Sequence, residues 1–305
     1  MENIWDTIII GGGPAGLTAG LYCARAGLRT LLLEGTALGG QLLLTDAIEN
    51  YPGTGSVSGT ALTDAMVRQA SSAGLTIRND TILGASLSGP CKELRGEKQD
   101  YLARTVVLAT GASPRKLGLP EETRLLGRGV SYCALCDGFF FRGKTVCVVG
   151  GGNSAVSEAL YLAKLCREVS VVHRRDNFTA QEGLLKKLNE TPNIQLLQNR
   201  TISRILGEEA VRGIVLRTLP AHAEQTLPCD GLFIAIGRTP NTSFLPRTLN
   251  RDSQGYVYAD ENLAANLPGI FAAGDIRKKP LRQIVTAVSD GALAAASVEK
   301  YLKNP

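Results

Sequence analysis

The sequence predicts an α/β protein of two domains, and three observations lead to that prediction. The chain has 305 residues, which is more than one ordinary hydrophobic core supports. Many of its 34 glycines follow short apolar runs, a pattern typical of tight turns between a strand and a helix. A segment with these features occurs twice, at residues 6–35 and 144–176. The duplication predicts two Rossmann-like domains.

Each of the two segments is expected to form a strand, a helix and a second strand. The first reads DTIIIGGGPAGLTAGLYCARAGLRTLLLEG, and the second reads KTVCVVGGGNSAVSEALYLAKLCREVSVVHRRD. In both, an apolar run suited to a buried parallel strand ends in a glycine triplet and passes into a stretch rich in Ala and Leu. Both segments therefore indicate βαβ units.

The glycine spacing in each unit is that of a dinucleotide-binding turn. Glycine permits the tight turn, the approach of a pyrophosphate and close helix packing, while the helix N-terminus attracts phosphate. The first turn contains Gly11, Gly13, Pro14, Ala15 and Gly16, and the second contains Gly150, Gly152, Asn153, Ser154 and Ala155. We expect two dinucleotide sites; the alternative is that both turns are purely structural.

The second strands of the two units end differently. Aligning Gly11 with Gly150 places Glu34 opposite His173. An acid at this position accepts hydrogen bonds from a free ribose 2'-hydroxyl, as in FAD or NAD. The second unit instead has His173, Arg174 and Arg175, which suit a 2'-phosphate and so favour NADPH. A solvated basic strand end is the alternative explanation.

The expected domain boundaries follow from two further segments in which a strand ends. VVLATGAS (106–113) and GIFAAGDIR (269–277) are both expected to end at a ligand, with Asp275 facing a hydroxyl-rich chain. The first domain would then be discontinuous, because its last piece returns after the second domain. We expect FAD-binding parts at 1–114 and 243–305, and an inserted NADPH-binding domain at 115–242.

SYCALCDGFF (131–140) contains Cys133 and Cys136 at C-x-x-C spacing, followed by Asp137. A zinc site would need further ligands, and the two histidines form no ligand motif with the pair. A disulfide across so short a loop is a weak staple. Redox cycling remains, with Asp137 as a proton donor to the leaving thiolate or as a plain turn residue. A flavin is the usual intermediary between NADPH and a disulfide.

Composition excludes several other classes. The net charge of +5 is spread along the chain, so nucleic-acid binding is not expected. The N-terminus lacks the features of a signal peptide, and no apolar run is long enough for a membrane helix. We expect a cytoplasmic protein whose other five cysteines are small buried hydrophobes, namely Cys23, Cys91, Cys147, Cys166 and Cys229.

Over essentially its whole length the sequence resembles the low-molecular-weight, bacterial-type thioredoxin reductases. The resemblance rests on several long motifs in the family's order, among them GGGPAGLTAG, GGQLLLTDAIENYPG, LATGA, GRGVSYCALCDGFF, VVGGGNSAVSEALYLA, VVHRRDNF, IAIGRTPNT and GIFAAGDIRKKPLRQIVTAVSDGALAA. It implies a homodimeric NADPH–thioredoxin reductase that uses FAD. It also implies that the NADPH domain rotates relative to the FAD domain.

The same resemblance assigns roles to individual residues. Cys136 would lie nearest the flavin, Cys133 would attack the disulfide of thioredoxin, and Asp137 would be the acid–base residue. It implies FAD contacts from the first glycine turn and from Glu34, Gly39, Gly40, Gln41, Asn50, Ala109, Gly111, Asp275, Arg282, Gln283 and Ile284. It implies NADPH contacts from the second turn and from His173, Arg174, Arg175, Gly237 and Arg238.

Two positions depart from the family pattern. Thr179 stands where an Arg is usual, so one cation expected near the 2'-phosphate is absent, and Leu135 stands where Thr is common. Other hypotheses are a related flavoprotein with a different disulfide partner, a ferredoxin–NADP reductase, and a nucleotide sensor without turnover. The C-x-x-C pair argues against the ferredoxin–NADP reductase, and a thioredoxin-dependent rate of NADPH consumption would exclude the sensor.

Overall fold

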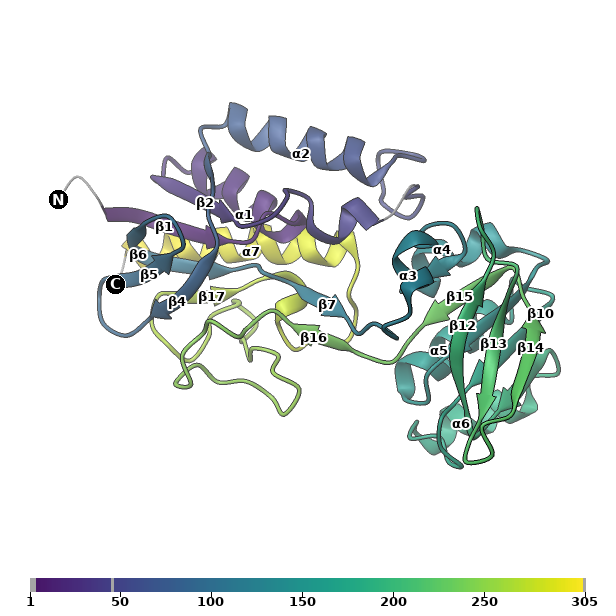
Figure 1. Ribbon diagram of the computed structural model, residues 1–305. Helices are drawn as coiled ribbons and strands as arrows, with labels where there is room; N and C mark the ends of the chain where they lie inside the picture. The colour runs from purple at the N-terminus through teal and green to yellow at the C-terminus, as the bar shows by residue number, and fades with distance from the viewer. Residues whose placement is uncertain (1–3, 45–46, 304–305) are drawn as a thin grey trace. The chain divides into compact units, whose positions relative to one another are not determined.

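The computed structural model describes residues 4–44 and 47–303 (Figure 1). The chain forms two compact units. Unit 1 is discontinuous and consists of Met1–Ser113 and Thr239–Pro305, whereas unit 2 is Pro114–Arg238. The chain thus enters unit 2 after residue 113 and leaves it after residue 238, compared with the expected 114 and 242.

Unit 1 is built on a sheet with the strand order β3-β2-β1-β6-β5-β4, to which β17 adds by pairing with β6. The strands are β1 (Ile4–Ile10), β2 (Thr30–Glu34), β3 (Thr76–Asn79), β4 (Ile82–Ser86), β5 (Lys92–Gly96), β6 (Asp100–Leu108) and β17 (Ile270–Ala272). Strands β1, β2, β3, β6 and β17 pair in parallel, while β4, β5 and β6 form an antiparallel meander.

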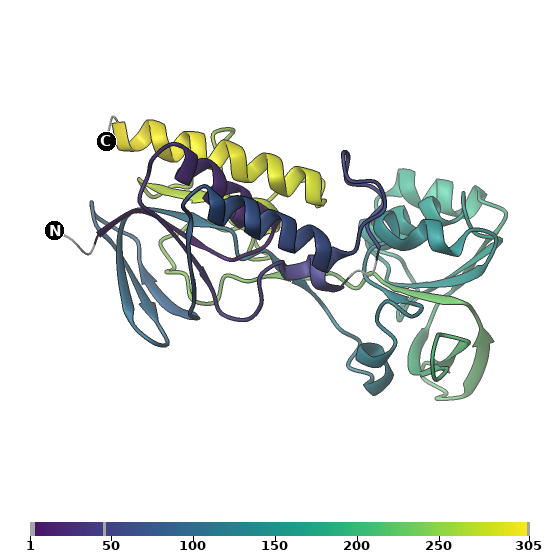
Figure 2. The same ribbon diagram turned by 90° about the horizontal axis from the view of Figure 1, so that it is seen from above.

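Three helices of unit 1 pack together: α1 (Pro14–Arg25), α2 (Gly59–Ser72) and α7 (Ile284–Lys303). Helix α1 contacts both α2 and α7 (Figure 2). Alternate side chains of the parallel strands bury against different layers. Ile9 and Val107 face the cluster that includes α1 and α7, whereas Ile8 and Val106 face the cluster that includes Leu94 of the meander. The FAD-type βαβ unit expected from the sequence is therefore present as β1-α1-β2.

Unit 2 repeats the βαβ arrangement. Its parallel sheet has the order β11-β10-β9-β15-β8. The strands are β8 (Val130–Ser131), β9 (Thr145–Val149), β10 (Glu168–Val172), β11 (Ile194–Leu197) and β15 (Gly231–Ile234). The helices are α3 (Pro120–Arg124), α4 (Ala134–Asp137), α5 (Asn153–Leu162) and α6 (Glu182–Glu190). A Rossmann-like fold in both units confirms the predicted fold class.

A second, antiparallel sheet covers one face of the parallel sheet in unit 2. It consists of β12 (Arg200–Leu206), β13 (Gly213–Thr218) and β14 (Glu224–Pro228). Val149 and Leu232 pack with Ile214 on that side, whereas Val148 packs with Val156 of α5 on the other. The buried strands therefore read as continuous apolar runs because both of their faces are covered.

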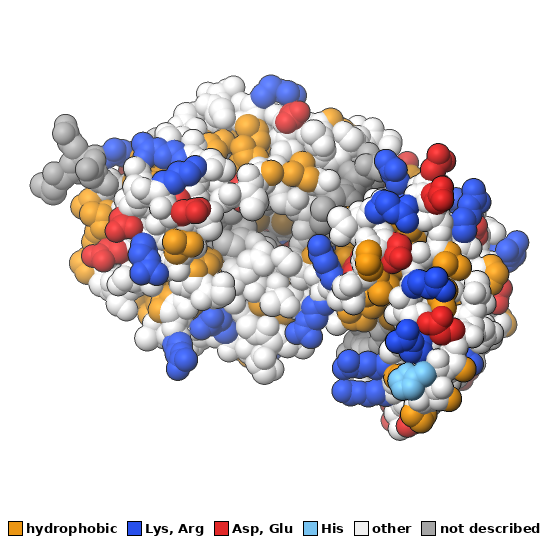
Figure 3. Space-filling view, in the orientation of Figure 1, with side chains coloured by type: hydrophobic (Ala, Val, Ile, Leu, Met, Phe, Trp, Pro, Cys, Tyr) orange, Lys and Arg blue, Asp and Glu red, His pale blue; other side chains and the backbone are white. Residues whose placement is uncertain are grey.

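The two crossings between the units, β7 (Ala112–Pro114) and β16 (Arg238–Pro240), pair as a two-stranded sheet. On the face seen in Figure 3, basic and acidic side chains are interspersed over each unit. Among the helices that the structure describes, none is long and apolar enough to cross a membrane.

Four of the five scattered cysteines are buried as expected: Cys23, Cys147, Cys166 and Cys229. Burial raises the pKa of each of these four thiols, to about 12 for Cys23, for example. The expectation is wrong for Cys91, which is only half-buried because it lies in the connection just before β5.

Candidate active site

The first glycine turn has no room for a side chain at two of its glycines, whereas a third glycine faces open space. A Cβ on Gly11 would lie 2.4 Å from the Ala109 carbonyl oxygen, and a Cβ on Gly16 would lie 1.9 Å from the Gly11 oxygen. At Gly13, the N-cap of α1, a Cβ would meet nothing within 4 Å. The helix N-terminus is therefore approachable at Gly13, which fits a pyrophosphate at this point.

Glu34 lies beside this turn. Its Oε2 accepts a 2.7 Å hydrogen bond from the Gly12 amide, and its Oε1 accepts one of 3.0 Å from the Thr36 amide. The Gly39 amide in turn donates to the Gly12 oxygen at 2.8 Å. These bonds bring Glu34 and the Gly39-Gly40 segment to the same end of the sheet, where a carboxylate retains further lone pairs for a ribose hydroxyl.

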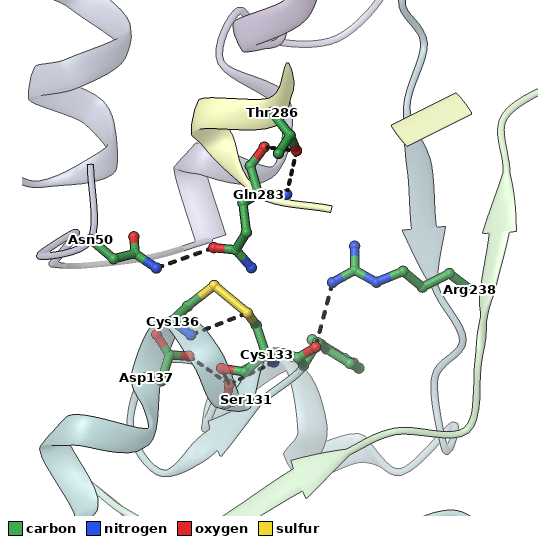
Figure 4. Close-up of a disulfide and its surroundings, with 9 residues drawn as sticks. Asn50, Ser131, Cys133, Cys136, Asp137, Arg238, Gln283 and Thr286 are labelled. Carbon is green, nitrogen blue, oxygen red and sulfur yellow. Dashed lines mark hydrogen bonds between the residues drawn. A yellow bond between two sulfur atoms is a disulfide. The ribbon is translucent and has the colours of Figure 1, made fainter. Parts of the chain in front are cut away.

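The remaining predicted FAD residues gather at the same end of unit 1. A Cβ on Gly274 would lie 2.8 Å from the Ala15 Cβ, which places the Asp275 turn against α1. Gln41 Nε2 donates to the Ala112 oxygen, close to Ala109 and Gly111 in the chain. Asn50 Nδ2 donates to Gln283 Oε1 at 3.1 Å, just before Ile284 opens α7 (Figure 4).

Arg282 offers an independent sign of a ligand in this region. Its Nε is buried and has no hydrogen-bond partner within the described residues. Its guanidinium carbon lies 4.2 Å from the centre of the Tyr256 ring, which fixes its place by a cation–π contact. A buried guanidinium nitrogen without a partner fits an anionic group such as a phosphate.

A buried ion cluster supports the Asp275 turn, and the sequence reasoning missed it. Asp290 of α7 accepts hydrogen bonds from the Gly274 amide, from Arg277 and from Lys279, each at 2.8 to 2.9 Å. Lys279 also lies 3.9 Å from Asp275. Burial acts to raise the pKa of Asp290, but the hydrogen bonds and charges of Arg277 and Lys279 outweigh it and lower that pKa.

The second glycine turn, in unit 2, has the same design as the first. A Cβ on Gly150 would lie 2.4 Å from the Ala235 oxygen, whereas at Gly152, the N-cap of α5, the nearest atom is Thr179 Oγ1 at 3.8 Å. Asn153 follows, and its side-chain oxygen accepts the Gln181 amide at 2.8 Å. The approach to the α5 N-terminus, where Ser154 and Ala155 follow, is therefore open.

His173 is packed under this turn. A Cβ on Gly151 would lie 2.2 Å from its ring, the ring stacks on Phe178, and Nε2 lies 3.1 Å from the Asn177 oxygen. Burial, together with the charges of Arg175 and Arg174, lowers the pKa of His173, although the Asn177 contact opposes this. His173 is therefore neutral near pH 7 and shapes the turn.

The cations at this strand end are Arg174 and Arg175, both of which are exposed. Thr179, which replaces the cation expected from the family pattern, is tied to the turn, since its amide donates to the Gly151 oxygen at 2.8 Å. The strand end therefore presents two exposed guanidinium groups to solvent.

Cys133 and Cys136 are joined in a disulfide with a Cα–Cα distance of 5.3 Å (Figure 4). Cys133 is the N-cap of α4, and its sulfur accepts a 3.2 Å hydrogen bond from the Cys136 amide. The same amide can stabilise a thiolate on Cys133 after reduction. The C-x-x-C pair thus forms a redox-competent turn.

Ser131 connects this turn to Asp137, a contact that the sequence reasoning missed although Ser131 lies in the same motif. Its hydroxyl accepts the Cys133 amide at 3.0 Å and donates to Asp137 Oδ2 at 2.5 Å (Figure 4). Asp137 is thereby held beside the cysteine pair, as an acid–base residue requires.

Tyr132, between Ser131 and Cys133, is anchored on two sides. Its hydroxyl donates to the buried Glu122, which also accepts the amides of Leu117 and Gly118. Its carbonyl accepts a 3.4 Å hydrogen bond from Arg238 Nη2, which follows Gly237 at the end of unit 2 (Figure 4). The structure thus places Arg238, a predicted NADPH residue, against the cysteine turn.

Comparison with known proteins agrees with these features. Residues 5–291 match the family described as pyridine nucleotide-disulphide oxidoreductase. The thioredoxin reductase of Peptoclostridium acidaminophilum is 43% identical, covering 99% of this chain and 98% of the relative. The solved thioredoxin reductase of Streptococcus pyogenes superposes with a TM-score of 0.95 at 39% identity and covers 100% of both chains. That of Giardia duodenalis gives a TM-score of 0.94 at 34% identity and covers 99% of each chain.

Two glycine-turn domains and a C-x-x-C disulfide define a pyridine nucleotide-dependent disulfide oxidoreductase. At this identity and coverage, the chain belongs to the bacterial-type thioredoxin reductases within that family.

Proposed function

We propose that the protein uses NADPH to reduce the disulfide Cys133–Cys136 and passes the electrons on to oxidised thioredoxin. FAD bound in unit 1 supplies the electron transfer between NADPH and sulfur. The observation that carries the proposal is the disulfide at the N-cap of α4, on the same unit as the second glycine turn. The family membership of the chain supports the same chemistry.

We assign one cofactor to each of the two glycine turns. FAD is assigned to unit 1, where the open N-cap at Gly13, the carboxylate of Glu34 and Arg282 suit its phosphates and ribose. Among the described residues, Arg282 Nε has no hydrogen-bond partner. NADPH is assigned to unit 2, where Arg174 and Arg175 suit the 2'-phosphate. No acid stands in unit 2 at the position that Glu34 occupies in unit 1. The other residues named for each cofactor in the sequence analysis are retained in these assignments.

The dithiol itself performs the second half of the reaction. Two electrons and two protons convert the disulfide into two thiols. A thiolate on Cys133 then attacks the disulfide of thioredoxin, and Cys136 attacks the resulting mixed disulfide, releasing reduced thioredoxin and restoring Cys133–Cys136. Asp137, held by Ser131, moves the proton to the leaving thiolate.

The surroundings of the pair suit a protein partner. Leu135 is 45% exposed, and Phe139 and Phe140 are 52% and 41% exposed. Large apolar side chains exposed beside a reactive group favour docking of an apolar protein surface. Thioredoxin is the partner proposed for this surface, and a homodimer in the cytoplasm is the proposed assembly and location.

The assay is NADPH oxidation with and without oxidised thioredoxin, comparing the wild type with Cys133→Ser. The wild type should consume NADPH in proportion to thioredoxin, and the variant should lose that rate because no mixed disulfide forms at residue 133. Cys91→Ser is the matched control, since it removes a half-buried thiol of unit 1 and should leave the rate unchanged. Thioredoxin reduction by Cys133→Ser at the wild-type rate would overturn the proposal.

A further inference from the structure

The peptide group that joins Tyr132 to Cys133 is held at both of its polar ends. Its oxygen, the Tyr132 carbonyl, accepts a 3.4 Å hydrogen bond from Arg238 Nη2. Its N–H, the Cys133 amide, donates to the Ser131 hydroxyl at 3.0 Å (Figure 4). Because Cys133 is the N-cap of α4, the orientation of this peptide group sets where the turn that carries both sulfurs begins.

The side chain of Tyr132 anchors the same peptide group from a third direction. Its hydroxyl donates to Oε1 of Glu122, a residue of α3 that is 2% exposed. Burial and the neighbouring carboxylate raise the pKa of Tyr132, so the hydroxyl remains a donor at neutral pH. The ring packs against an apolar cluster of unit 2, as Leu117 and Ile236 also do. A phenylalanine would keep this packing and lose the hydrogen bond.

Glu122 connects Tyr132 to the segment by which the chain enters unit 2, residues 115–118. Its Oε1 also accepts the Leu117 amide at 3.1 Å, and its Oε2 accepts the Gly118 amide at 2.9 Å. A buried carboxylate is costly unless hydrogen bonds compensate it. The Tyr132 hydroxyl contributes to this compensation, so its loss weakens the connection between the entry segment and the cysteine turn.

The segment by which the chain leaves unit 2, residues 237–238, reaches the same peptide group. Arg238, which donates to the Tyr132 carbonyl, is the first residue of β16. The Arg115 amide, one residue after the end of β7, donates to the Gly237 oxygen at 3.0 Å and so joins the entry and exit segments. Both segments are therefore connected to the cysteine turn through Tyr132.

We propose that Tyr132 is a positioning residue for the redox disulfide, because through Glu122 and Arg238 it fixes the Cys133 peptide group to the entry and exit segments of unit 2. The inference rests on the proposed function only in taking Cys133–Cys136 as the redox pair. Thiol–disulfide exchange depends on the alignment of the reacting sulfurs. A misplacement of about 1 Å can cost about a hundredfold in rate. The hydroxyl should therefore affect the reaction step more than substrate binding.

The kinetic test is Tyr132→Phe, which retains the ring and removes the hydroxyl. With thioredoxin as the varied substrate, kcat should fall about three- to tenfold, whereas KM should stay within about twofold of the wild-type value. Tyr161→Phe, which removes a hydroxyl near the C-terminal end of α5, is the matched control and should keep the wild-type kcat. A wild-type kcat in Tyr132→Phe, with or without a lower melting temperature, would mean a structural role alone and would overturn the inference.

A double-mutant cycle tests whether the hydroxyl acts through Glu122. Glu122→Gln keeps the length of the side chain but replaces one acceptor oxygen with an NH2 group, so it weakens the same set of hydrogen bonds. If both residues act through one contact, kcat of the double variant should lie close to that of the slower single variant. Losses that multiply as two independent effects would contradict the inference.

Hydrogen exchange tests the positioning without the catalytic reaction. The oxidised holoenzyme is placed in D2O without NADPH or thioredoxin, and mass spectrometry with fragmentation follows the Cys133 amide. In Tyr132→Phe this amide should exchange about three- to tenfold faster than in wild type, since its peptide group has lost one anchor, while β13 should exchange at the wild-type rate. Equal exchange at Cys133, or an increase spread evenly over unit 2, would count against the inference.

The exchange measurement also distinguishes this inference from the proposed function. A wild-type protein that fails to reduce thioredoxin would count against the proposed function alone, because neither NADPH nor thioredoxin enters the exchange measurement. Normal thioredoxin reduction by the wild type, together with wild-type exchange at Cys133 in Tyr132→Phe, would refute the inference alone. If Tyr132→Phe does not fold, Glu122→Gln serves for the same exchange measurement with the same expected result.

Discussion

Ser131 and Asp137 are joined by a 2.5 Å hydrogen bond from the serine hydroxyl to Oδ2 of the carboxylate. The same hydroxyl accepts the Cys133 amide at 3.0 Å. One small side chain thus contacts both the Asp137 carboxylate and the Cys133 amide, and it holds the carboxylate against the cysteine turn. This relationship makes Ser131 a direct target for mutation.

Ser131→Ala should lower kcat for thioredoxin reduction about three- to tenfold, because a hydrogen bond of this kind contributes about 0.5–1.5 kcal/mol. Binding of FAD in unit 1 should not change. Steady-state kinetics with thioredoxin as the varied substrate measure the effect. Ser203→Ala is the control, since it also removes two hydrogen bonds in unit 2, to Val215 and Glu224. Equal kcat values for Ser131→Ala and the wild type would refute the positioning role.

Substitutions at two glycines of the first turn should have different effects, one on FAD binding and the other on folding. At Gly13 an added methyl meets no protein atom within 4 Å, so Gly13→Ala should fold normally but weaken FAD binding by about tenfold, since the methyl occupies the approach to the helix N-terminus. At Gly16 the methyl would lie 1.9 Å from the Gly11 oxygen, so Gly16→Ala should destabilise unit 1 itself.

Fluorescence titration of the apoproteins with FAD and urea unfolding distinguish the two effects. If Gly13→Ala bound FAD as tightly as the wild type, the pyrophosphate could not lie at the N-terminus of α1 beside Gly13.

Arg175→Ala should lower kcat/KM for NADPH about three- to tenfold and leave kcat/KM for NADH unchanged, because an exposed guanidinium contributes less to a phosphate than a buried one. Wild type should still prefer NADPH by at least about tenfold, since Arg174 and Arg175 together offset the missing cation at Thr179. Arg167→Ala removes an exposed arginine of the same unit and serves as control. Equal losses with both nucleotides would contradict a 2'-phosphate contact.

Asp290→Asn should lower the free energy of unfolding by about 3 kcal/mol at neutral pH, because it takes this counter-charge from the buried Lys279 and the half-buried Arg277. The folded-state pKa of Asp290 lies below its ordinary 3.8, so its contribution is present above that value and is lost as pH falls through the folded-state pKa. The difference between variant and wild type should therefore persist from mildly acidic to neutral pH and shrink only in strong acid. Urea unfolding across pH measures it.

Asp64→Asn, an exposed change on α2, is the control for this prediction. A pH-independent difference that survived in strong acid would contradict the role of the Asp290 charge.

The two βαβ units could be predicted from the sequence because the residues that define them lie close together in the chain. The apolar runs, the glycine spacing and the contrast between Glu34 and the segment His173-Arg174-Arg175 all lie within short segments, and the observed strands follow them. The C-x-x-C turn was local for the same reason.

The supporting contacts were not local. Asp290 meets Gly274 only after the chain folds, and this acid belongs to no spaced motif. His173 was expected as a chargeable group at the phosphate, but its burial against Gly151 depends on tertiary packing that no local pattern encodes. A polar position on an otherwise apolar helix face, such as Asp290, is the one signal that could have indicated such a residue.

The most direct test of the electron path is a visible absorption titration of the holoenzyme without oxygen. NADPH should bleach the flavin band, and oxidised thioredoxin added afterwards should restore it, whereas in Cys133→Ser the bleached band should persist after thioredoxin is added. Bleaching by NADPH without recovery on thioredoxin in the wild type would contradict the path from NADPH through Cys133–Cys136 to thioredoxin.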